Sequence, residues 1–256
     1  MIMDRTSGGW HLKYLIIGDT HGSIDLGKVT TEILDTLEPD DAIIHCGDFG
    51  APWTGDEHDP TLQFWRSLKN RVYICLGNHE NYDWILRQPV VESTGGTCYQ
   101  LGDNLFAPFL GEILTIGKKR FWFYSGGYSV DFLYRTPGKT IWKQELATRE
   151  QSSRAIERLK QSGGVDFIIT HDGPREFIMK YWGYPIGGPK PAYYKLLGVQ
   201  EQETIHPGFA LDEVYQRPDL WQRWFFGHHH RDDDRECIRP IFRDIILIQD
   251  DQETIL

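Results

Sequence analysis

Apolar residues in the first ninety positions form three short continuous runs, at residues 12–17, 41–46 and 71–76. Runs of this kind are typical of strands that are covered on both faces. A helical repeat lies between the first two runs and ends before Pro39, and a second helix is predicted around residues 62–68. The helical repeat consists of Leu26, Val29, Ile33, Leu34 and Leu37. Strands that alternate with helices at this spacing predict parallel strands with right-handed crossovers.

The remainder of the chain predicts a hairpin, a helix and further strands. Residues 112–116 and 120–127 flank a Gly-Lys-Lys turn, as in a β-hairpin. A polar helix then leads to a buried strand at residues 165–170, and three more strand-like segments close the chain. Residues 181–194 are rich in Gly and Pro and predict irregular structure.

No linker or internal repeat divides the chain, so we expect a single domain over residues 1–256. Residues 1–11 lack the apolar centre of a signal peptide and predict a flexible lead-in. Residues 181–205 are expected to form an inserted loop near the functional site. Because no run of about 18 apolar residues occurs, we expect no membrane-spanning helix and no membrane partner.

The overall charge narrows the possible partners. A net charge of −10 argues against binding of long nucleic acids, which requires a broad basic surface. A small anionic substrate remains compatible with this charge if the site supplies positive charge locally. Cys46 and Cys75 lie in strand-like runs and no C-x-x-C pair occurs, so we expect buried thiols and a cytoplasmic location.

Polar clusters of one kind follow five of the predicted strands. The clusters are GDTHG at residues 18–22, GDFG at 47–50, GNHE at 77–80, THDGP at 170–174 and GHHH at 227–230. Any one cluster has an ordinary explanation, such as a helix cap or a surface histidine. Because the carboxyl ends of parallel strands border one crevice, we expect the five clusters to meet there.

The residue types in these clusters predict a metal site. Imidazoles combined with a few carboxylates and an amide oxygen suit Mn, Fe, Co or Zn better than calcium. Asp19 and His21 alternate to the same face of an extended segment, so both can reach one ion. His228 and His230 repeat this spacing.

The order GDTHG, GDFG, GNHE, THDGP, GHHH resembles the calcineurin-like metallophosphoesterase superfamily, over nearly the whole chain from Asp19 to His230. The resemblance implies an α/β fold, a four-layer α-β-β-α sandwich of two mixed sheets with the site at the strand ends. It also implies two divalent metal ions, with Mn expected first and Fe, Zn, Co or Ni as alternatives.

Carried over position by position, the resemblance implies a role for each residue of the site. One metal would take Asp19, His21 and His230, and the other would take Asn78, His171 and His228. Asp48 would bridge the two ions. His79 would be the catalytic histidine, which donates to the departing oxygen, while a metal-bridging hydroxide attacks phosphorus.

The second cluster departs from one branch of this superfamily. Serine/threonine phosphatases of the eukaryotic type resemble GDxVDRG at this position, whereas this chain reads GDFGAPW. The missing Asp-Arg removes an arginine that binds the substrate phosphate and an acidic partner of the catalytic histidine. We therefore expect a member of bacterial or phage type, and residues 126–145 resemble such members.

Two loops are candidates for substrate recognition. Arg135 lies among aromatic residues and can grip a phosphate, or the aromatics can form a packed cluster with the basic residues in solvent. Tyr184 lies in the inserted loop and can touch substrate, or the loop can lie elsewhere. His229 stands between two expected ligands and is expected to point away from the metals, within reach of substrate.

The favoured function is a phosphatase for phosphomonoesters, either small phosphate esters or phosphoproteins. A phosphodiesterase or nuclease for cyclic or short nucleotides needs the same metals and is the alternative. A third alternative is a scaffold without catalysis, although the intact His79 and complete ligand set argue against it. The sequence gives no indication of the oligomeric state.

Overall fold

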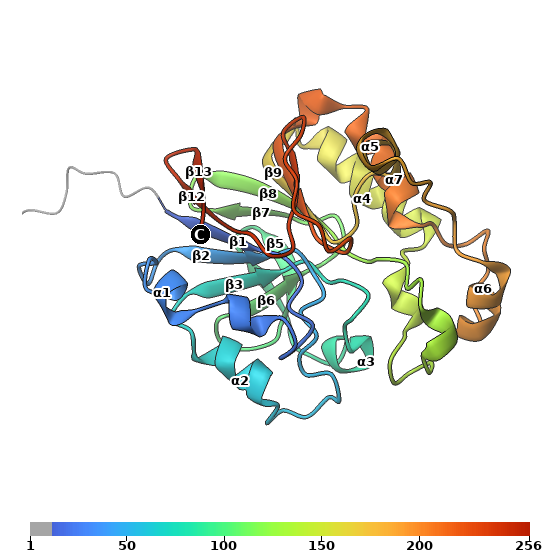
Figure 1. Ribbon diagram of the computed structural model, residues 1–256, viewed down its shortest axis with the longest axis horizontal. Coiled ribbons are helices and arrows are strands. Elements are labelled where there is room, and N and C mark those ends of the chain that lie inside the picture. The colour runs from blue at the N-terminus through green and yellow to red at the C-terminus, as the bar shows by residue number, and fades with distance from the viewer. Residues whose placement is uncertain (1–11) are drawn as a thin grey trace, which may run out of the picture.

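The computed structural model describes residues 12–256, so the predicted lead-in at residues 1–11 lies outside the described residues. The described chain forms two mixed β-sheets with helices on their outer faces (Figure 1). In spatial order, the larger sheet contains β13 (Gln252–Ile255), β12 (Ile245–Gln249), β1 (Tyr14–Ile17), β2 (Ala42–His45), β3 (Arg71–Ile74), β6 (Leu105–Pro108), β5 (Gly96–Gln100) and β4 (Val90–Ser93). The smaller sheet contains β11 (Ile238–Pro240), β10 (Trp221–Phe226), β9 (Val165–Thr170), β8 (Lys119–Tyr124) and β7 (Ile113–Ile116).

Parallel strands form the centre of both sheets. In the larger sheet, β1, β2, β3 and β6 are parallel neighbours, and β12 pairs with β1 in the opposite direction. In the smaller sheet, β8, β9, β10 and β11 are parallel, and β7 and β8 form the predicted hairpin. The carboxyl ends of β1, β2 and β3 therefore share one edge, as do those of β9 and β10.

Alternate side chains of β1 pack into two different hydrophobic clusters. Tyr14 and Ile16 of β1 face the smaller sheet, in a cluster that includes Phe121 and Phe123 of β8. Leu15 of β1 faces the opposite way and packs with the helices that cover the larger sheet. Because side chains alternate along a strand, a run such as YLII fills both layers at once. This arrangement confirms the predicted four-layer sandwich.

Helices cover the outer face of each sheet (Figure 1). The larger sheet is covered by α1 (Thr31–Leu34), α2 (Pro60–Ser67) and α3 (Tyr82–Ile85). The smaller sheet is covered by α4 (Arg149–Gln161), α5 (Arg175–Trp182) and α7 (Pro207–Tyr215). The remaining helices are α6 (Pro191–Leu197) and the 3₁₀ turns Leu26–Lys28, Phe132–Tyr134, Lys143–Glu145 and Pro218–Leu220.

Two predictions of secondary structure, one of a helix and one of an irregular segment, were wrong in detail. The helix expected across residues 26–37 is a 3₁₀ turn followed by the single turn α1, because Thr30 adopts an extended conformation and caps α1. The segment expected to be irregular at residues 181–194 contains the end of α5 and the start of α6. Pro191 is the first residue of α6, where the missing N–H of proline costs nothing, and Tyr193 is fully buried.

Two simpler expectations concern the membrane and the cysteines. No helix in residues 12–256 combines the length and the apolar character that a membrane crossing needs. Cys46 and Cys75 are buried free thiols, as expected, and Cys98 is a third. Cys237 is also free but exposed.

The cluster between the sheets makes a prediction about stability. Phe123 is fully buried there, so Phe123→Ala is expected to lower the free energy of unfolding by about 3–5 kcal/mol. Met179, which is 45% exposed on α5, provides the control, since Met179→Ala is expected to change it by less than about 0.5 kcal/mol. Urea unfolding followed by circular dichroism measures both. Equal losses in the two variants would show that this cluster does not hold the sheets together.

Candidate metal centre

The five polar clusters follow strands from both sheets. The larger sheet supplies Asp19, Asp48 and Asn78, which follow β1, β2 and β3 respectively. The smaller sheet supplies His171 after β9 and His228 after β10. The structure brings all five predicted clusters together, as the sequence predicted from strand polarity.

Asp48 lies at the centre of this cluster and is 2% exposed. Its Oδ1 lies 3.1 Å from His171 Nε2, and its Oδ2 lies 3.3 Å from His21 Nε2. The backbone N–H of His79 donates to Asp48 Oδ1 at 2.7 Å. Burial would raise the pKa of Asp48, but the neighbouring His171 and His21 hold it well below its usual range. The carboxylate is therefore ionised and faces both halves of the cluster.

One group of three potential ligands lies on the side of Asp19. The ligand atoms of Asp19, His21 and His230 all lie within 4.8 Å of one another. His230 Nε2 is 3.3 Å from Asp19 Oδ2 and also 3.3 Å from His21 Nε2. These three residues can hold one ion, in the combination that the resemblance implied.

A second group lies on the other side of Asp48. The ligand atoms of Asp48, His171 and His228 lie within 4.8 Å of one another. Asn78 Oδ1 lies 3.0 Å from His171 Nε2 and joins this group. A third combination within the same distance consists of His21, Asp48 and His79, so His79 borders both groups.

The hydrogen bonds of two histidines fit metal binding. His171 Nδ1 lies 3.0 Å from the carbonyl oxygen of Cys46, and His21 Nδ1 lies 2.7 Å from Asp25 Oδ2. Since a carbonyl or carboxylate oxygen can only accept, each Nδ1 carries the proton. Burial would lower the pKa of both imidazoles, but the neighbouring Asp48 and Asp19 raise it to about 10 for His171 and to about 9 for His21, so here each Nε2 donates toward Asp48. A bound ion would displace that proton and take the Nε2 lone pair, which is the usual way in which a ligand histidine is oriented.

Backbone strain also concentrates at the potential ligands. Positive φ angles are uncommon outside glycine and cost of the order of 1 kcal/mol or more per residue. Of the nine such residues in the described part of the chain, four are potential ligands: His21 (46°), Asp48 (51°), His228 (65°) and His230 (48°). At Gly227, a Cβ atom would lie 2.0 Å from Asp19 Oδ1, so only glycine fits beside this carboxylate. The donor set, the oriented imidazoles and the strain together fit divalent transition-metal ions.

The environment of His79 combines an arginine and a tryptophan. Arg135 Nη2 is in short contact with His79 Nε2, and the ring of Trp53 stacks on His79 at 5.9 Å between centroids. Burial lowers the pKa of His79 to about 4, Asp48 opposes this shift, and Arg135 adds to it. A guanidinium can only donate, so in this arrangement His79 Nε2 is an acceptor and the imidazole is neutral.

Arg135 reaches the site although most of its loop packs elsewhere. Its side chain is 6% exposed, its Nε lies 2.8 Å from Asp131 Oδ1, and its Nη1 donates to the backbone carbonyl of Asn78 at 3.3 Å. Tyr128 and Phe132 pack with Tyr193 of α6 in a separate apolar cluster. The aromatics therefore pack as the second alternative expected, whereas Arg135 is buried beside His79 and is not in solvent; its binding of a phosphate stays a prediction.

Tyr184 and His229 lie beside the metal ligands and contact each other. The Tyr184 hydroxyl is 3.0 Å from His229 Nδ1, and His229 Nε2 is 2.8 Å from Asp172 Oδ1. Asp172 is fully buried, and His229 together with the nearby His228 and His206 outweighs burial and lowers its pKa. The carboxylate thus fixes His229, and Tyr184 extends the chain of contacts to the surface.

Glu80 has a role that the sequence did not reveal. It is 1% exposed and accepts three backbone N–H groups, from Phe49 (2.8 Å), Gly50 (3.0 Å) and Gly77 (3.2 Å). These donors flank Asp48 and Asn78, so one carboxylate holds two ligand loops together. Its position at the end of GNHE was the available signal, but two of its three partners, Phe49 and Gly50, are 31 and 30 residues away in the chain, and only the fold brings them near.

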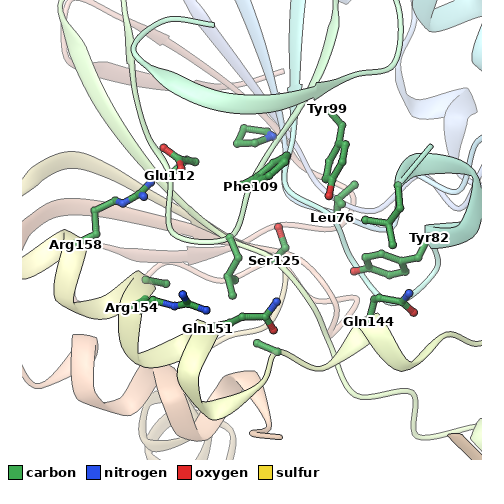
Figure 2. A pocket seen from close by; sticks show the side chains of 15 residues that line it. Leu76, Tyr82, Tyr99, Phe109, Glu112, Ser125, Gln144, Gln151, Arg154 and Arg158 are labelled. Carbon is green, nitrogen blue, oxygen red and sulfur yellow. Dashed lines mark ion pairs between the residues drawn. The ribbon is translucent and has the colours of Figure 1, made fainter. Parts of the chain in front are cut away.

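A separate cavity lies away from these ligands. Figure 2 shows Tyr82, Tyr99 and Phe109 on one side of it and Ser125 near its centre. The cavity has a volume of about 400 Å³ and none of the predicted metal ligands lines it. The candidate metal centre is thus defined by converging polar side chains and not by the depth of a pocket.

A two-sheet α/β sandwich with carboxylates and imidazoles gathered at its strand ends has the arrangement of a metal-dependent hydrolase. The chain belongs to the calcineurin-like phosphoesterase family, whose pattern matches residues 12–232. Metal-dependent phosphoesterase activity follows from this membership.

Solved structures align with the chain at low sequence identity, and one of them has a similar fold. One covers 96% of this chain and 98% of its own, with a TM-score of 0.55 and 12% identity. The phosphopantetheinyl hydrolase of Mycobacterium tuberculosis aligns over 92% and 89% of the two chains, with a TM-score of 0.48 and 15% identity. A protein of unknown function from Aquifex aeolicus aligns over 63% and 81%, with a TM-score of 0.36 and 16% identity. No curated protein is significantly similar to the chain in sequence.

The contacts of Glu80 predict a structural role for its carboxylate. In Glu80→Gln, an amide NH₂ replaces one acceptor oxygen and leaves at least one buried N–H without a partner. The free energy of unfolding is expected to fall by about 1–3 kcal/mol in urea unfolding. Glu150→Gln, at a residue exposed on α4, is expected to change it by less than about 0.5 kcal/mol. A stable Glu80→Gln protein would mean that the two loops hold each other without this carboxylate.

Proposed function

We propose that the protein hydrolyses phosphomonoesters, with manganese as the preferred metal. The observation that carries the proposal is Arg135, a buried guanidinium that contacts His79 beside the two ligand groups. This residue supplies the local positive charge that an acidic protein needs to bind a phosphate ester. Arg135 lies in residues 126–145. In serine/threonine phosphatases of the eukaryotic type, the arginine that binds phosphate lies instead in the second cluster, which resembles GDxVDRG.

The charge of the substrate distinguishes monoesters from diesters at this position. A phosphomonoester has three non-bridging oxygens and nearly two negative charges at neutral pH, whereas a diester has two such oxygens and one charge. Arg135 is separate from the metal ligands, so it matches the additional oxygen and charge of a monoester. Guanidinium groups suit this task because their N–H donors match two oxygens of a phosphate at once.

The side chains of the site divide into binding and proton-holding roles. Asp19, His21 and His230 would hold one metal, Asn78, His171 and His228 the other, and Asp48 would contact both. Bound divalent ions lower the pKa of a coordinated water and neutralise charge on the phosphoryl group. Arg135 would bind the phosphate, and its transfer to that phosphate would free His79 Nε2 to take a proton from water and then donate it to the leaving oxygen. Tyr184 and His229 would contact the remainder of a small ester or a phosphorylated side chain.

Activity on model substrates tests the proposal. With manganese, the protein is expected to hydrolyse p-nitrophenyl phosphate with a higher kcat/KM than bis-p-nitrophenyl phosphate, measured by release of nitrophenolate. Chelation is expected to abolish both activities, and added manganese to restore them. Preference for the diester would overturn the monoester assignment.

Arg135→Met is the more specific test. Loss of one donor to a developing oxyanion typically costs about 100- to 1,000-fold in rate, so kcat/KM for the monoester is expected to fall by about this factor. The diester activity is expected to fall far less, because a diester lacks the charge that Arg135 matches. Arg154→Met, at a residue 69% exposed on α4, is the matched control and should leave both activities unchanged. Parallel losses for both substrates in Arg135→Met would contradict a role in phosphate charge recognition.

A further inference from the structure

Asn78 is the one amide among the potential metal ligands, and both Oδ1 and Nδ2 of its side chain have hydrogen-bond partners. The residue is 2% exposed, and Oδ1 lies 3.0 Å from His171 Nε2, inside the second ligand group. Its Nδ2 donates to Ser129 Oγ at 3.1 Å. Ser129 belongs to residues 126–145, outside all five clusters.

An amide ligand has an orientation problem that a carboxylate lacks. Its oxygen can bind a metal, but its NH₂ group has no lone pair for that purpose. A rotation of the Asn78 side-chain amide by 180° would therefore replace the ligand atom by a donor. The neighbour of the NH₂ group decides which orientation is stable.

Ser129 presents an acceptor to Asn78 because its own proton is used elsewhere. Its hydroxyl donates to Glu145 Oε2 at 2.6 Å, which leaves the oxygen lone pairs facing Asn78. Ser129 is 1% exposed, so no solvent competes for these bonds. A lone pair at this position stabilises the NH₂ group and would repel the amide oxygen.

Glu145 is fixed in turn by its other contacts. The residue is fully buried, its Oε1 accepts from the backbone N–H of Trp142 at 3.1 Å, and the Tyr193 hydroxyl lies 3.5 Å from Oε2. Burial raises the pKa of Glu145 to about 8, and the hydrogen bonds from Ser129 and from the Trp142 N–H oppose this shift. Oε1 is already occupied by the Trp142 N–H, so Oε2 is the oxygen that accepts from the Ser129 hydroxyl.

The backbone of the same segment approaches the ligand closely. A Cβ atom at Gly127 would lie 2.7 Å from Asn78 Oδ1, and the Gly127 N–H donates to the carbonyl of Glu145 at 3.1 Å. The segment that carries Ser129 is thus packed against the ligand atom itself. A side chain at position 127 would therefore collide with the Asn78 oxygen, so glycine is required there.

We infer that Ser129 and Glu145 are positioning residues that hold the Asn78 amide with its oxygen toward the second metal. The inference rests on the proposed role of Asn78 as a ligand. Neither residue touches the substrate or the metal in this arrangement. Their effect is expected on the affinity of one metal site, since partners of a ligand typically change metal affinity by about 10- to 100-fold.

Manganese titration of the metal-stripped protein, by calorimetry, tests the inference. Ser129→Ala removes the acceptor, and Glu145→Gln keeps the volume but offers Ser129 a donor in place of an acceptor. Each is expected to weaken one of two manganese sites by about 10- to 100-fold and to leave the other unchanged. Ser152→Ala is the matched control, because Ser152 is a buried serine that accepts from the Tyr124 hydroxyl on the far side of β8. It should leave both sites intact.

The possible outcomes separate the inference from the proposed function. Two wild-type affinities in both Ser129→Ala and Glu145→Gln would overturn the inference while the phosphatase assignment stands. Fewer than two sites in the wild-type protein would instead overturn the two-metal assignment itself. If Ser129→Ala fails to fold by circular dichroism, the isosteric Glu145→Gln decides alone.

Discussion

The arrangement of the loops at the strand ends depends on one buried negative charge, the carboxylate of Asp48. Water is excluded from it, so its charge must be balanced by the imidazoles of His21 and His171 and by a backbone N–H. Those partners come from strands of two different sheets. The need to balance the charge of Asp48 thus brings three loops together. Glu80 completes the arrangement by accepting from three backbone N–H groups next to Asp48 and Asn78.

The strand ends store conformational strain in a pattern that has a physical reason. The D-x-H and H-x-H pairs were expected from the sequence to lie in extended segments, in which residues i and i+2 share a face, but the backbone is not extended at His21, His228 and His230. Left-handed backbone at His21, Asp48, His228 and His230 turns these side chains inward instead. The apolar strands before them are almost fully buried and hold these costly conformations in place.

The gathering of the five clusters was predicted from the sequence because it follows from the polarity of parallel strands, whereas the sandwich was expected from the family resemblance. The sequence did not predict that α1 is a single turn, because the apolar repeat outweighed the local cap at Thr30, or that α6 is a helix, because the burial of Tyr193 depends on tertiary contacts. Arg135 was identified only as one of two possibilities for its loop. The roles of Glu80 and Ser129 could not be read from the sequence, because each has a partner in a distant loop, Phe49 for Glu80 and Asn78 for Ser129, which only the fold brings near.

Each of the two ligand groups takes residues from both sheets, with Asp19 and Asn78 from the larger sheet and His228 and His230 from the smaller. The geometry of the site therefore depends on how the two sheets are aligned. A displacement of one sheet by about 1 Å would alter both metal positions at once, and displacements of this size are enough to change rates about 100-fold. The aromatic residues between the sheets lie far from the phosphate site, but their packing sets the distance between the two sheets. They therefore also set the distances between the potential ligands that each ion would need.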